Sequence, residues 1–256
     1  MSDTALIIAA HGSGEATAAI DQVKALARKV QDRGRFDEVT PTFHLGEPTF
    51  AQVLDTVTAS TITVVPLMTS EGHFNQVVLP RELARNRRFA DVRLTQTDPV
   101  GTHPAIVEIC KRRIEVLEEQ FGFQAKDATI AVVGHGTKRH ENSSTATERL
   151  ADALRTRAQV GEVLTAFLDD DPTVESLPPR SSRPIMVVLP FLIGGGAHTY
   201  RDLPRRLGLA IRGGRSGPMS GRIGEKQIIC DRAIGEDPGI VEIILDLAQE
   251  PIAPPS

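Results

Sequence analysis

Short apolar runs alternate with amphipathic stretches along the whole chain, and two of these runs lead into histidines. Residues 185–193 are nearly all apolar, with the length and β-branched content of a strand buried on both faces. Three glycines follow, and then His198 stands where a helix begins. Residues 61–80 repeat this order, with Gly72 before His73. Ligands gather beyond the carboxyl ends of parallel strands, so both stretches are candidate sites.

The pattern belongs to an internal repeat. An apolar run ending in His-Gly and a hydroxyl residue occurs as LIIAAHGSG around His11 and as IAVVGHGTK around His135, 124 residues later. His73 and His198 are 125 apart because the second copy has one extra glycine. The spacing of 124 also relates three pairs of prolines, which are Pro48 and Pro172, Pro66 and Pro190, and Pro80 and Pro204. A repeat of this length indicates a duplicated domain.

The repeat predicts the domain boundaries. PVGTHPAIVEIC matches AIGEDPGIVEII, and the spacing of Pro104 and Pro238 grows to 134 because residues 209–224 read as an inserted loop. The sequence therefore predicts one domain over residues 1–124, a second over 125–250, and a loose Pro-rich tail over 251–256.

Strand and helix patterns alternate within each copy. This alternation predicts parallel sheets with helices on both faces, so the predicted fold class is α/β, with two tandem flavodoxin-like domains. The predicted strands are 5–10, 39–43, 62–68, 92–95, 129–134, 163–168, 185–193 and 227–230, and the predicted helices are 16–32, 49–58, 74–86, 104–120, 144–158, 173–177, 199–206 and 238–249.

Composition narrows the function classes. The chain has 256 residues, 24% of them charged, with a net charge of −4 and scattered basic residues, which disfavours nucleic-acid binding. Tryptophan is absent and Tyr200 is the one tyrosine, which argues against stacking on flat bases. The sequence contains no apolar segment long enough to predict a membrane span, and the expected compartment is the cytoplasm. Cys110 and Cys230 stand in apolar surroundings and are predicted to be buried, unpaired thiols.

Four histidines carry the candidate chemistry. His11 and His73 end the first and third strands of the first copy, and His135 and His198 do so in the second. These strands can be neighbours in a doubly wound sheet, so each pair could face one cleft. Imidazoles in that position suit a divalent transition metal and also proton transfer near neutral pH. His44 stands at a strand end beside the first cleft without a repeat partner, and its role is open.

Other polar residues have competing interpretations. His103 and His140 are predicted to be solvated or capping residues, and Ser13 and Thr137 to cap a helix or bond to the turn. Asp169 follows the second strand of its copy and is expected to face the site. Glu47 and Asp171 either join a site or cap the following helix. The glycine turn at 194–196 lacks the spacing of a phosphate loop.

In their order and duplication, these motifs resemble the class II tetrapyrrole chelatases, and most closely the sirohydrochlorin chelatases of the CbiX type in their two-copy form. The matching elements are His-Gly-hydroxyl after the first strand, a strand with VP or LP leading to a glycine turn with His, the following Leu-Pro helix and a G-x-x-P helix start. The resemblance implies a flavodoxin-like chelatase fold in pseudo-two-fold arrangement. It implies insertion of Co²⁺ or Fe²⁺ into sirohydrochlorin, for cobalamin or sirohaem.

The resemblance also implies residue roles. His11, His73, His135 and His198 would hold the incoming metal and accept protons from the pyrrole nitrogens, and Asp169 would assist as a metal-binding carboxylate. The substrate is rich in carboxylates, so Arg81, Arg85, Arg201 and Arg205 are candidate substrate-binding residues, with surface solvation as the alternative. Which copy is active stays open at this point.

Three function classes are therefore compared. The first is a sirohydrochlorin chelatase, a lyase with no cofactor beyond its substrate metal, expected to act as a monomer without nucleic-acid or membrane partners. The second is a non-catalytic carrier of tetrapyrrole or metal, derived from a chelatase. The third is a flavodoxin-like nucleotide or flavin binder, which the missing phosphate loop disfavours.

Overall fold

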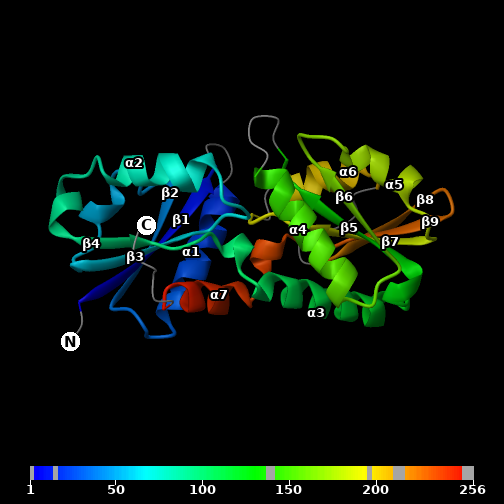
Figure 1. Ribbon diagram of the computed structural model, residues 1–256, viewed down its shortest axis with the longest axis horizontal. Helices are drawn as coiled ribbons and strands as arrows, with labels where there is room; N and C mark the ends of the chain where they lie inside the picture. The colour runs from blue at the N-terminus through cyan, green and yellow to red at the C-terminus, as the bar shows by residue number, and fades with distance from the viewer. Residues whose placement is uncertain (1–2, 14–16, 137–141, 195–197, 210–216, 250–256) are drawn as a thin grey trace. The chain divides into compact units, whose positions relative to one another are not determined.

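A computed structural model describes residues 3–13, 17–136, 142–194, 198–209 and 217–249. The chain divides into two compact units, each built on one sheet with helices packed against it (Figure 1). Unit 1 contains Met1–His103 and Pro238–Ser256, and unit 2 contains Pro104–Asp237.

The sheet of unit 1 has four parallel strands in the order β2-β1-β3-β4. These strands are β1 (Thr4–Gly12), β2 (Glu38–Leu45), β3 (Thr61–Pro66) and β4 (Arg93–Gln96). Ala5 to Ala10 of the inner strand β1 are all buried, as its apolar sequence predicts. Pro41 lies on the edge strand β2, and edge strands are the usual place for a proline in a sheet. The strand order is the flavodoxin-like one that the sequence predicts.

The sheet of unit 2 has five strands in the order β6-β5-β7-β9-β8. The parallel strands are β5 (Ala128–Gly134), β6 (Glu162–Phe167), β7 (Ile185–Pro190) and β9 (Lys226–Cys230). β8 (Met219–Ile223) pairs with β9 in antiparallel fashion, and Gly224, with φ 58°, lies in the turn between them. The prediction of a loop over 209–224 is therefore wrong for β8, whose glycine and arginine content hides the strand.

The helices of the first repeat are α1 (Thr17–Gln31), α2 (Leu79–Leu83) and α3 (Ala105–Phe121). Single turns complete this repeat: η1 (Val53–Asp55), η2 (Phe74–Val78), η3 (Arg87–Asp91) and η4 (Val100–Thr102), of which η2 is a π-helical turn. A further turn, η5 (Ala125–Asp127), lies just beyond the predicted repeat boundary. The predicted helix over 49–58 is wrong because only the 3₁₀ turn η1 forms there. The predicted helix over 74–86 begins with the π turn, and its α-helical part ends at Leu83, before the extended residue Asn86.

The second repeat follows the same plan. Its helices are α4 (Asn142–Arg157), α5 (Leu177–Arg180), α6 (Leu203–Arg206) and α7 (Ile240–Leu247). Its single turns are η6 (Val174–Ser176), the π-helical turn η7 (His198–Asp202) and η8 (Ile234–Glu236). A π turn thus follows the third strand in both repeats, at the candidate histidines His73 and His198.

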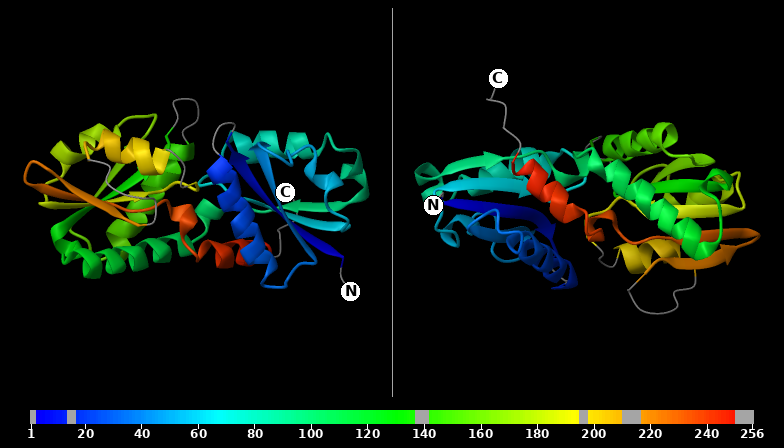
Figure 2. Two further views of the ribbon diagram at one scale, coloured as in Figure 1. Left: turned by 180° about the vertical axis from the view of Figure 1, so that it is seen from behind. Right: turned by 90° about the horizontal axis from the view of Figure 1, so that it is seen from below.

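The last helix of each repeat packs in the unit that holds the other repeat's sheet. In unit 2, Arg113 of α3 is buried and its guanidinium pairs with Asp231, just after β9, at 2.8 Å. In unit 1, α7 lies beside α1 (Figure 2), and Glu242 of α7 pairs with Arg33 at 2.6 Å. The compact units therefore do not coincide with the sequence repeats. The boundary predicted at residue 124 refers to the repeats, and for them it stays a prediction.

Both cysteines are free and buried in unit 2, as predicted. Burial raises the pKa of the Cys110 thiol and of the Cys230 thiol to about 12. Neither is a reactive thiolate. Among the described residues, no helix is long and apolar enough to cross a membrane.

Candidate functional site

The His-Gly motif brings the ends of two strands together in each unit. Gly12 has φ 74°, and a Cβ added to it would lie 2.1 Å from the Leu45 carbonyl oxygen at the end of β2. Gly136 has φ 70°, and its added Cβ would lie 2.8 Å from Cβ of Asp170. Only glycine satisfies both the positive φ and the close approach. The glycine therefore sets the histidine before it beside the loop that follows the second strand.

The histidine of this motif is oriented in the same way in both units. His11 Nδ1 lies 3.3 Å from the Gly12 carbonyl oxygen, and His135 Nδ1 lies 3.2 Å from that of Gly136. A protonated Nδ1 can donate to this carbonyl, and Nε2 then carries the ring's lone pair. Both imidazoles are exposed, so a ligand can reach them. The arrangement suits a histidine that binds a metal ion or accepts a proton through Nε2.

Three histidines of unit 1 share one aromatic neighbour. The Phe74 ring, at the start of η2, lies 4.7 Å from the His11 ring and 6.4 Å from the His73 ring, measured between centroids. The His44 ring is 5.0 Å from the same phenylalanine. The structure thus places His11 and His44 around the aromatic ring that directly follows His73 in the sequence.

In unit 2 the partner of the strand-end histidine is a carboxylate. Asp169 Oδ2 lies 3.2 Å from His135 Nδ1, and both side chains are more than half exposed, at 63% and 52%. The backbone N–H of Asp169 also donates to the His135 carbonyl at 2.8 Å. Asp169, the carboxylate expected at the end of the second strand, thus lies beside His135.

Arg206 of α6 braces the loop that carries Asp169. Its guanidinium donates to the Leu168 carbonyl and to both carboxylate oxygens of Glu175, at 2.6 and 2.8 Å. The hydrogen bonds from Arg206 lower the Glu175 pKa to about 2. In the first repeat Glu82 stands at the position of Arg206, and it pairs with Arg81 and Arg85 instead. Unit 2 therefore holds its second-strand loop in a way that unit 1 does not.

His198 begins the π turn η7, but its side chain lies outside the described residues. The turn itself is anchored two residues later. The Tyr200 hydroxyl donates a hydrogen bond to Glu236 of η8, and burial together with this bond raises the tyrosine pKa above its usual value. Tyr200 is therefore a candidate for positioning the backbone from which His198 projects.

The G-x-x-P motif supports the loop after the third strand. A Cβ added to Gly101 would lie 2.2 Å from the Thr69 carbonyl oxygen, and one on Gly235 would lie 2.0 Å from that of Ile193. The N–H of Gly101 donates to the Met68 carbonyl at 2.8 Å, and that of Gly235 to the Leu192 carbonyl at 3.0 Å. These glycines let the segment after the last strand lie against the loop that leads to His73 or His198.

The four candidate arginines lie on the surface. Arg81 and Arg85 each pair with Glu82 at 3.1 Å and have side chains that are 66% and 70% exposed. Arg201 Nε lies 4.0 Å from Asp202, and Arg205 is exposed. An exposed ion pair contributes at most about 1 kcal/mol, so a substrate carboxylate can compete for these guanidinium groups.

Neither Glu47 nor Asp171 caps a helix. The N-cap positions of η1 and η6 are Gln52 and Thr173, so the capping interpretation is wrong for both acids. They precede cis prolines, Pro48 and Pro172.

The sequence also offers His103, His140 and Thr137 as possible helix caps. His103 is half-buried at the C-terminal end of η4. His140 and Thr137 lie outside the described residues.

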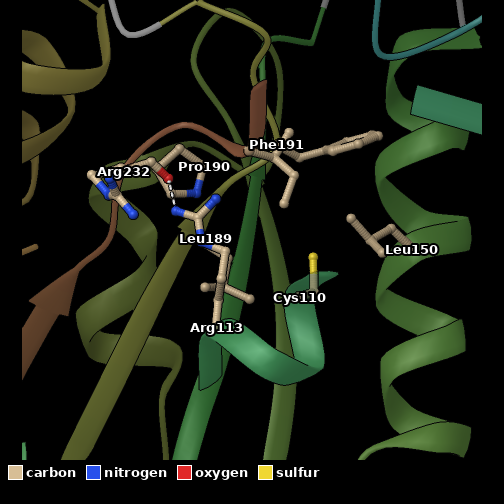
Figure 3. Close-up of a pocket in the computed structure, with 8 residues that line it drawn as sticks. Cys110, Arg113, Leu150, Leu189, Pro190, Phe191 and Arg232 are labelled. Carbon is tan, nitrogen blue, oxygen red and sulfur yellow. Dashed lines mark hydrogen bonds between the residues drawn. The ribbon is translucent and has the colours of Figure 1, made fainter. Parts of the chain in front are cut away.

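A small cavity of unit 2 has none of the candidate histidines among its lining residues. It is lined by Cys110, Arg113, Leu150, Leu189, Pro190, Phe191, Arg232 and Ile234, and it has room for little more than a water molecule. Figure 3 shows the Arg113 guanidinium reaching toward the Arg232 backbone, whose carbonyl accepts its hydrogen bond. The cavity is too small for a cofactor or substrate. Within the described ranges, no group of three or more His, Cys, Asp or Glu side chains is arranged to hold a metal ion.

Sequence reasoning missed several of these residues. Phe74, Arg206 and the Tyr200–Glu236 pair carry no motif of their own. Only the fold brings Arg206 to Glu175, 31 residues earlier, and Tyr200 to Glu236, 36 residues later. A comparison of the two repeats could have drawn attention to Arg206, because a glutamate replaces it in the first copy.

The fold and the duplicated histidine sites define a two-repeat protein of the chelatase type. The family model CbiX matches residues 5–117 and again 129–251. A protein of Halobacterium salinarum named "Probable sirohydrochlorin cobaltochelatase" is 33% identical over 272 residues, covering 98% of this chain and 92% of that protein. The chain belongs to the CbiX family.

Solved structures agree with this fold. A multi-domain protein of Deinococcus radiodurans with structural similarity to chelatases has a TM-score of 0.78 and 28% identity, over 98% of this chain and 55% of that one. The chain thus spans about half the length of that protein. The sirohydrochlorin chelatase SirB of Bacillus subtilis subspecies spizizenii, solved in complex with cobalt, has a TM-score of 0.74 at 17% identity, over 97% of this chain and 94% of SirB. These likenesses support tandem flavodoxin-like domains.

Proposed function

We propose that the chain is a sirohydrochlorin chelatase, a lyase that inserts a divalent metal ion, cobalt or ferrous iron, into the tetrapyrrole for cobalamin or sirohaem synthesis. The observation that carries the proposal is the strand-end histidine of each unit, whose Nδ1 faces the next residue's carbonyl so that Nε2 can act on a ligand. Membership of the CbiX family and the name of the Halobacterium relative support the same reaction.

The chemistry requires one ion to enter and two protons to leave. The free macrocycle carries two pyrrole N–H groups, and the inserted M²⁺ replaces both protons, so charge and atoms balance. Imidazoles serve both needs, since a neutral ring binds the ion through its lone pair and accepts a proton near neutral pH. We assign these roles to His11 and His73 in unit 1 and to His135 and His198 in unit 2.

Asp169 supports His135 in this scheme. Its carboxylate lies at the imidazole Nδ1, where it favours the tautomer with the Nε2 lone pair and stabilises the imidazolium that forms on proton uptake. It can also contribute an oxygen ligand to the incoming ion.

The exposed arginines serve the substrate's carboxylates. Arg81, Arg85, Arg201 and Arg205 offer planar guanidinium groups, and the ion pairs of the first three are weak enough to exchange for substrate. The substrates are the tetrapyrrole and the metal, and no further cofactor is part of the proposal. The cytoplasmic location and the monomeric state also stay predictions.

The test is an anaerobic absorbance assay of metal-free sirohydrochlorin with Co²⁺ or Fe²⁺. A chelatase accelerates loss of the free-tetrapyrrole spectrum over the rate without protein, with many turnovers per chain. Stoichiometric binding of tetrapyrrole or metal without acceleration would identify the carrier instead. Absence of both binding and acceleration would refute the two functions together.

A further inference from the structure

Arg232 follows β9 at the carboxyl end of the parallel strands of unit 2. Cys230, the last residue of β9, pairs with Val188 of β7, and the Asp231 N–H donates to the Val188 carbonyl at 2.9 Å. Arg232 therefore stands beside the segment that leads from β7 toward His198. Ligands of parallel α/β sheets bind beyond this end of the strands.

The guanidinium of Arg232 has no bonding partner among the residues that the structure describes. The residue is half-buried, its Nε is buried without a hydrogen bond, and its terminal nitrogens form no hydrogen bond or ion pair in this part of the chain. The acids around it are engaged elsewhere, since Asp231 pairs with Arg113 and Glu236 accepts the Tyr200 hydroxyl. Because burying a charged group without a partner is costly, this guanidinium is available to an anionic ligand.

The charge of Arg232 acts on the turn that carries His198. Burial and the bond to Glu236 raise the Tyr200 pKa, and the positive charge of Arg232 opposes them. Tyr200 belongs to the π turn η7, which begins at His198. The guanidinium is therefore close enough to this turn to bind a molecule that lies over the candidate site.

We propose that Arg232 binds a carboxylate of the tetrapyrrole substrate in unit 2. The proposal rests on the proposed function and adds an arginine that the repeated motifs do not contain. A guanidinium offers two parallel N–H groups to a carboxylate, and partial burial strengthens their attraction. Arg201, by contrast, has a side chain that is 73% exposed and lies next to Asp202.

Unit 1 has the opposite charge at the equivalent position. The spacing of 134 residues that relates Gly101 to Gly235 places Asp98 at the position of Arg232. Asp98 is exposed, and a carboxylate there repels the carboxylates of the substrate. The proposed contact therefore distinguishes unit 2 from unit 1.

Hydration is the competing role for Arg232. The residue helps to line the small cavity of unit 2, and a water molecule there could satisfy its Nε. Arg183 provides a matched comparison, because it is also half-buried and its Nε is also buried without a hydrogen bond. It precedes β7, at the amino end of the parallel strands, where the sheet is not expected to bind a ligand.

The experiment measures tetrapyrrole binding and metal insertion separately on the full-length protein. Absorbance titration with metal-free sirohydrochlorin, without metal, gives the dissociation constant, and Co²⁺ insertion gives kcat and the KM for sirohydrochlorin. The background removes the candidate residues of unit 1 and carries His11→Ala, His73→Ala, Arg81→Gln and Arg85→Gln.

Arg232→Gln is expected to raise both the dissociation constant and the KM of sirohydrochlorin at least about tenfold, the usual loss for a hydrogen bond between charged groups. The kcat should stay the same, because the contact is made equally before and during insertion. Arg232→Lys should recover part of the affinity, since it keeps the charge without the planar fork. Arg183→Gln should match the background in all three constants.

Unchanged affinity and KM in Arg232→Gln would overturn the proposal, and so would an equal loss in Arg183→Gln. Thermal unfolding checks each variant, and Arg232→Met, which keeps the apolar stem, takes the place of the glutamine variant if that one does not fold. Sirohydrochlorin binding that depends on Arg232 without insertion would contradict the chelatase function alone. Insertion with an unchanged KM in Arg232→Gln would contradict only the role of Arg232.

Discussion

His135 Nδ1 lies 3.2 Å from Asp169 Oδ2, and the first repeat has Leu45 at the position of Asp169. The carboxylate belongs to a loop whose backbone is held at Leu168 by Arg206. The two units thus differ where their second strands end, although their first strands end in the same His-Gly motif. The difference makes each unit separately testable.

Removing the charge of Asp169 should impair unit 2 alone. In a His11→Ala/His73→Ala background, Asp169→Asn is expected to lower the Co²⁺ insertion rate by about 10- to 100-fold, the usual cost of losing a partner that orients a ligating histidine. Initial rates at a fixed Co²⁺ concentration measure the effect. Asp152→Asn, which changes an exposed carboxylate on α4 outside the candidate site, is the control and should insert at the parent rate. Equal rates for both variants would contradict the role of Asp169.

Replacing the glycine of the His-Gly motif should lower the free energy of unfolding by more than the cost of its positive φ alone. Gly12 and Gly34 both have positive φ, 74° and 66°, but an added Cβ meets Leu45 at Gly12 and nothing within 4 Å at Gly34. Gly34→Ala should cost about 1 kcal/mol, the penalty for a left-handed residue. Gly12→Ala should cost at least about 2 kcal/mol more because the end of β2 must move. Urea unfolding followed by circular dichroism measures both, and equal losses would refute the close-approach argument.

Tyr200 should ionise only at strongly alkaline pH. Burial, and then the hydrogen bond to Glu236, raise its pKa. The phenol therefore stabilises the fold below its unfolded pKa near 10, and this stability is lost as pH rises through the higher folded value. The chain has one tyrosine and no tryptophan, so tyrosinate absorbance near 295 nm reports Tyr200 alone.

Glu236→Gln should lower the pH at which this absorbance rises while leaving it above 10, because burial remains. Titration of the native protein near pH 10 would show that Tyr200 is not held as the structure places it. An unchanged titration in Glu236→Gln would remove Glu236 as a cause.

The thiols of unit 2 should report how firmly α3 is attached. Cys110 and Cys230 are buried with pKa values raised to about 12, so Ellman's reagent should react with neither in the native protein. Arg113→Ala leaves Asp231 as a buried charge without its guanidinium partner, at a cost of about 3–5 kcal/mol. This variant should expose Cys110 to the reagent. Lys111→Ala, on the same helix, should not. Equal protection in the two variants would contradict the anchoring role of Arg113.

Much of the fold can be predicted from the sequence because buried parallel strands consist almost entirely of consecutive apolar residues. The predicted strand at 129–134 coincides with β5 to within a residue. The sequence pattern does not predict β8, because Gly221 and Arg222 interrupt its apolar residues. The sequence also does not predict that α3 and α7 each pack in the unit that holds the other repeat's sheet, since both helices have apolar faces that suit either sheet. Their partners are chosen by pairs such as Arg113–Asp231, which are 118 residues apart.

One part of the candidate site can likewise be predicted from the sequence, and another part cannot. His11 and His73 can be predicted to approach each other because strand order alone brings the first and third strands together. The surroundings of His44 cannot be predicted in this way, because they depend on the β1–β2 register and on the turn that Gly12 permits. Arg206 depends on α6 lying over η6, which no local pattern encodes.

The central claim is that strand-end histidines insert the metal, and Co²⁺ insertion into sirohydrochlorin tests it in four proteins. These are the wild type, His11→Ala/His73→Ala, His135→Ala/His198→Ala and the quadruple variant, each checked for an unchanged thermal unfolding midpoint. The account predicts acceleration by the wild type, a reduced rate in at least one double variant, and the rate of the protein-free control in the folded quadruple variant. Full acceleration by the quadruple variant would contradict it.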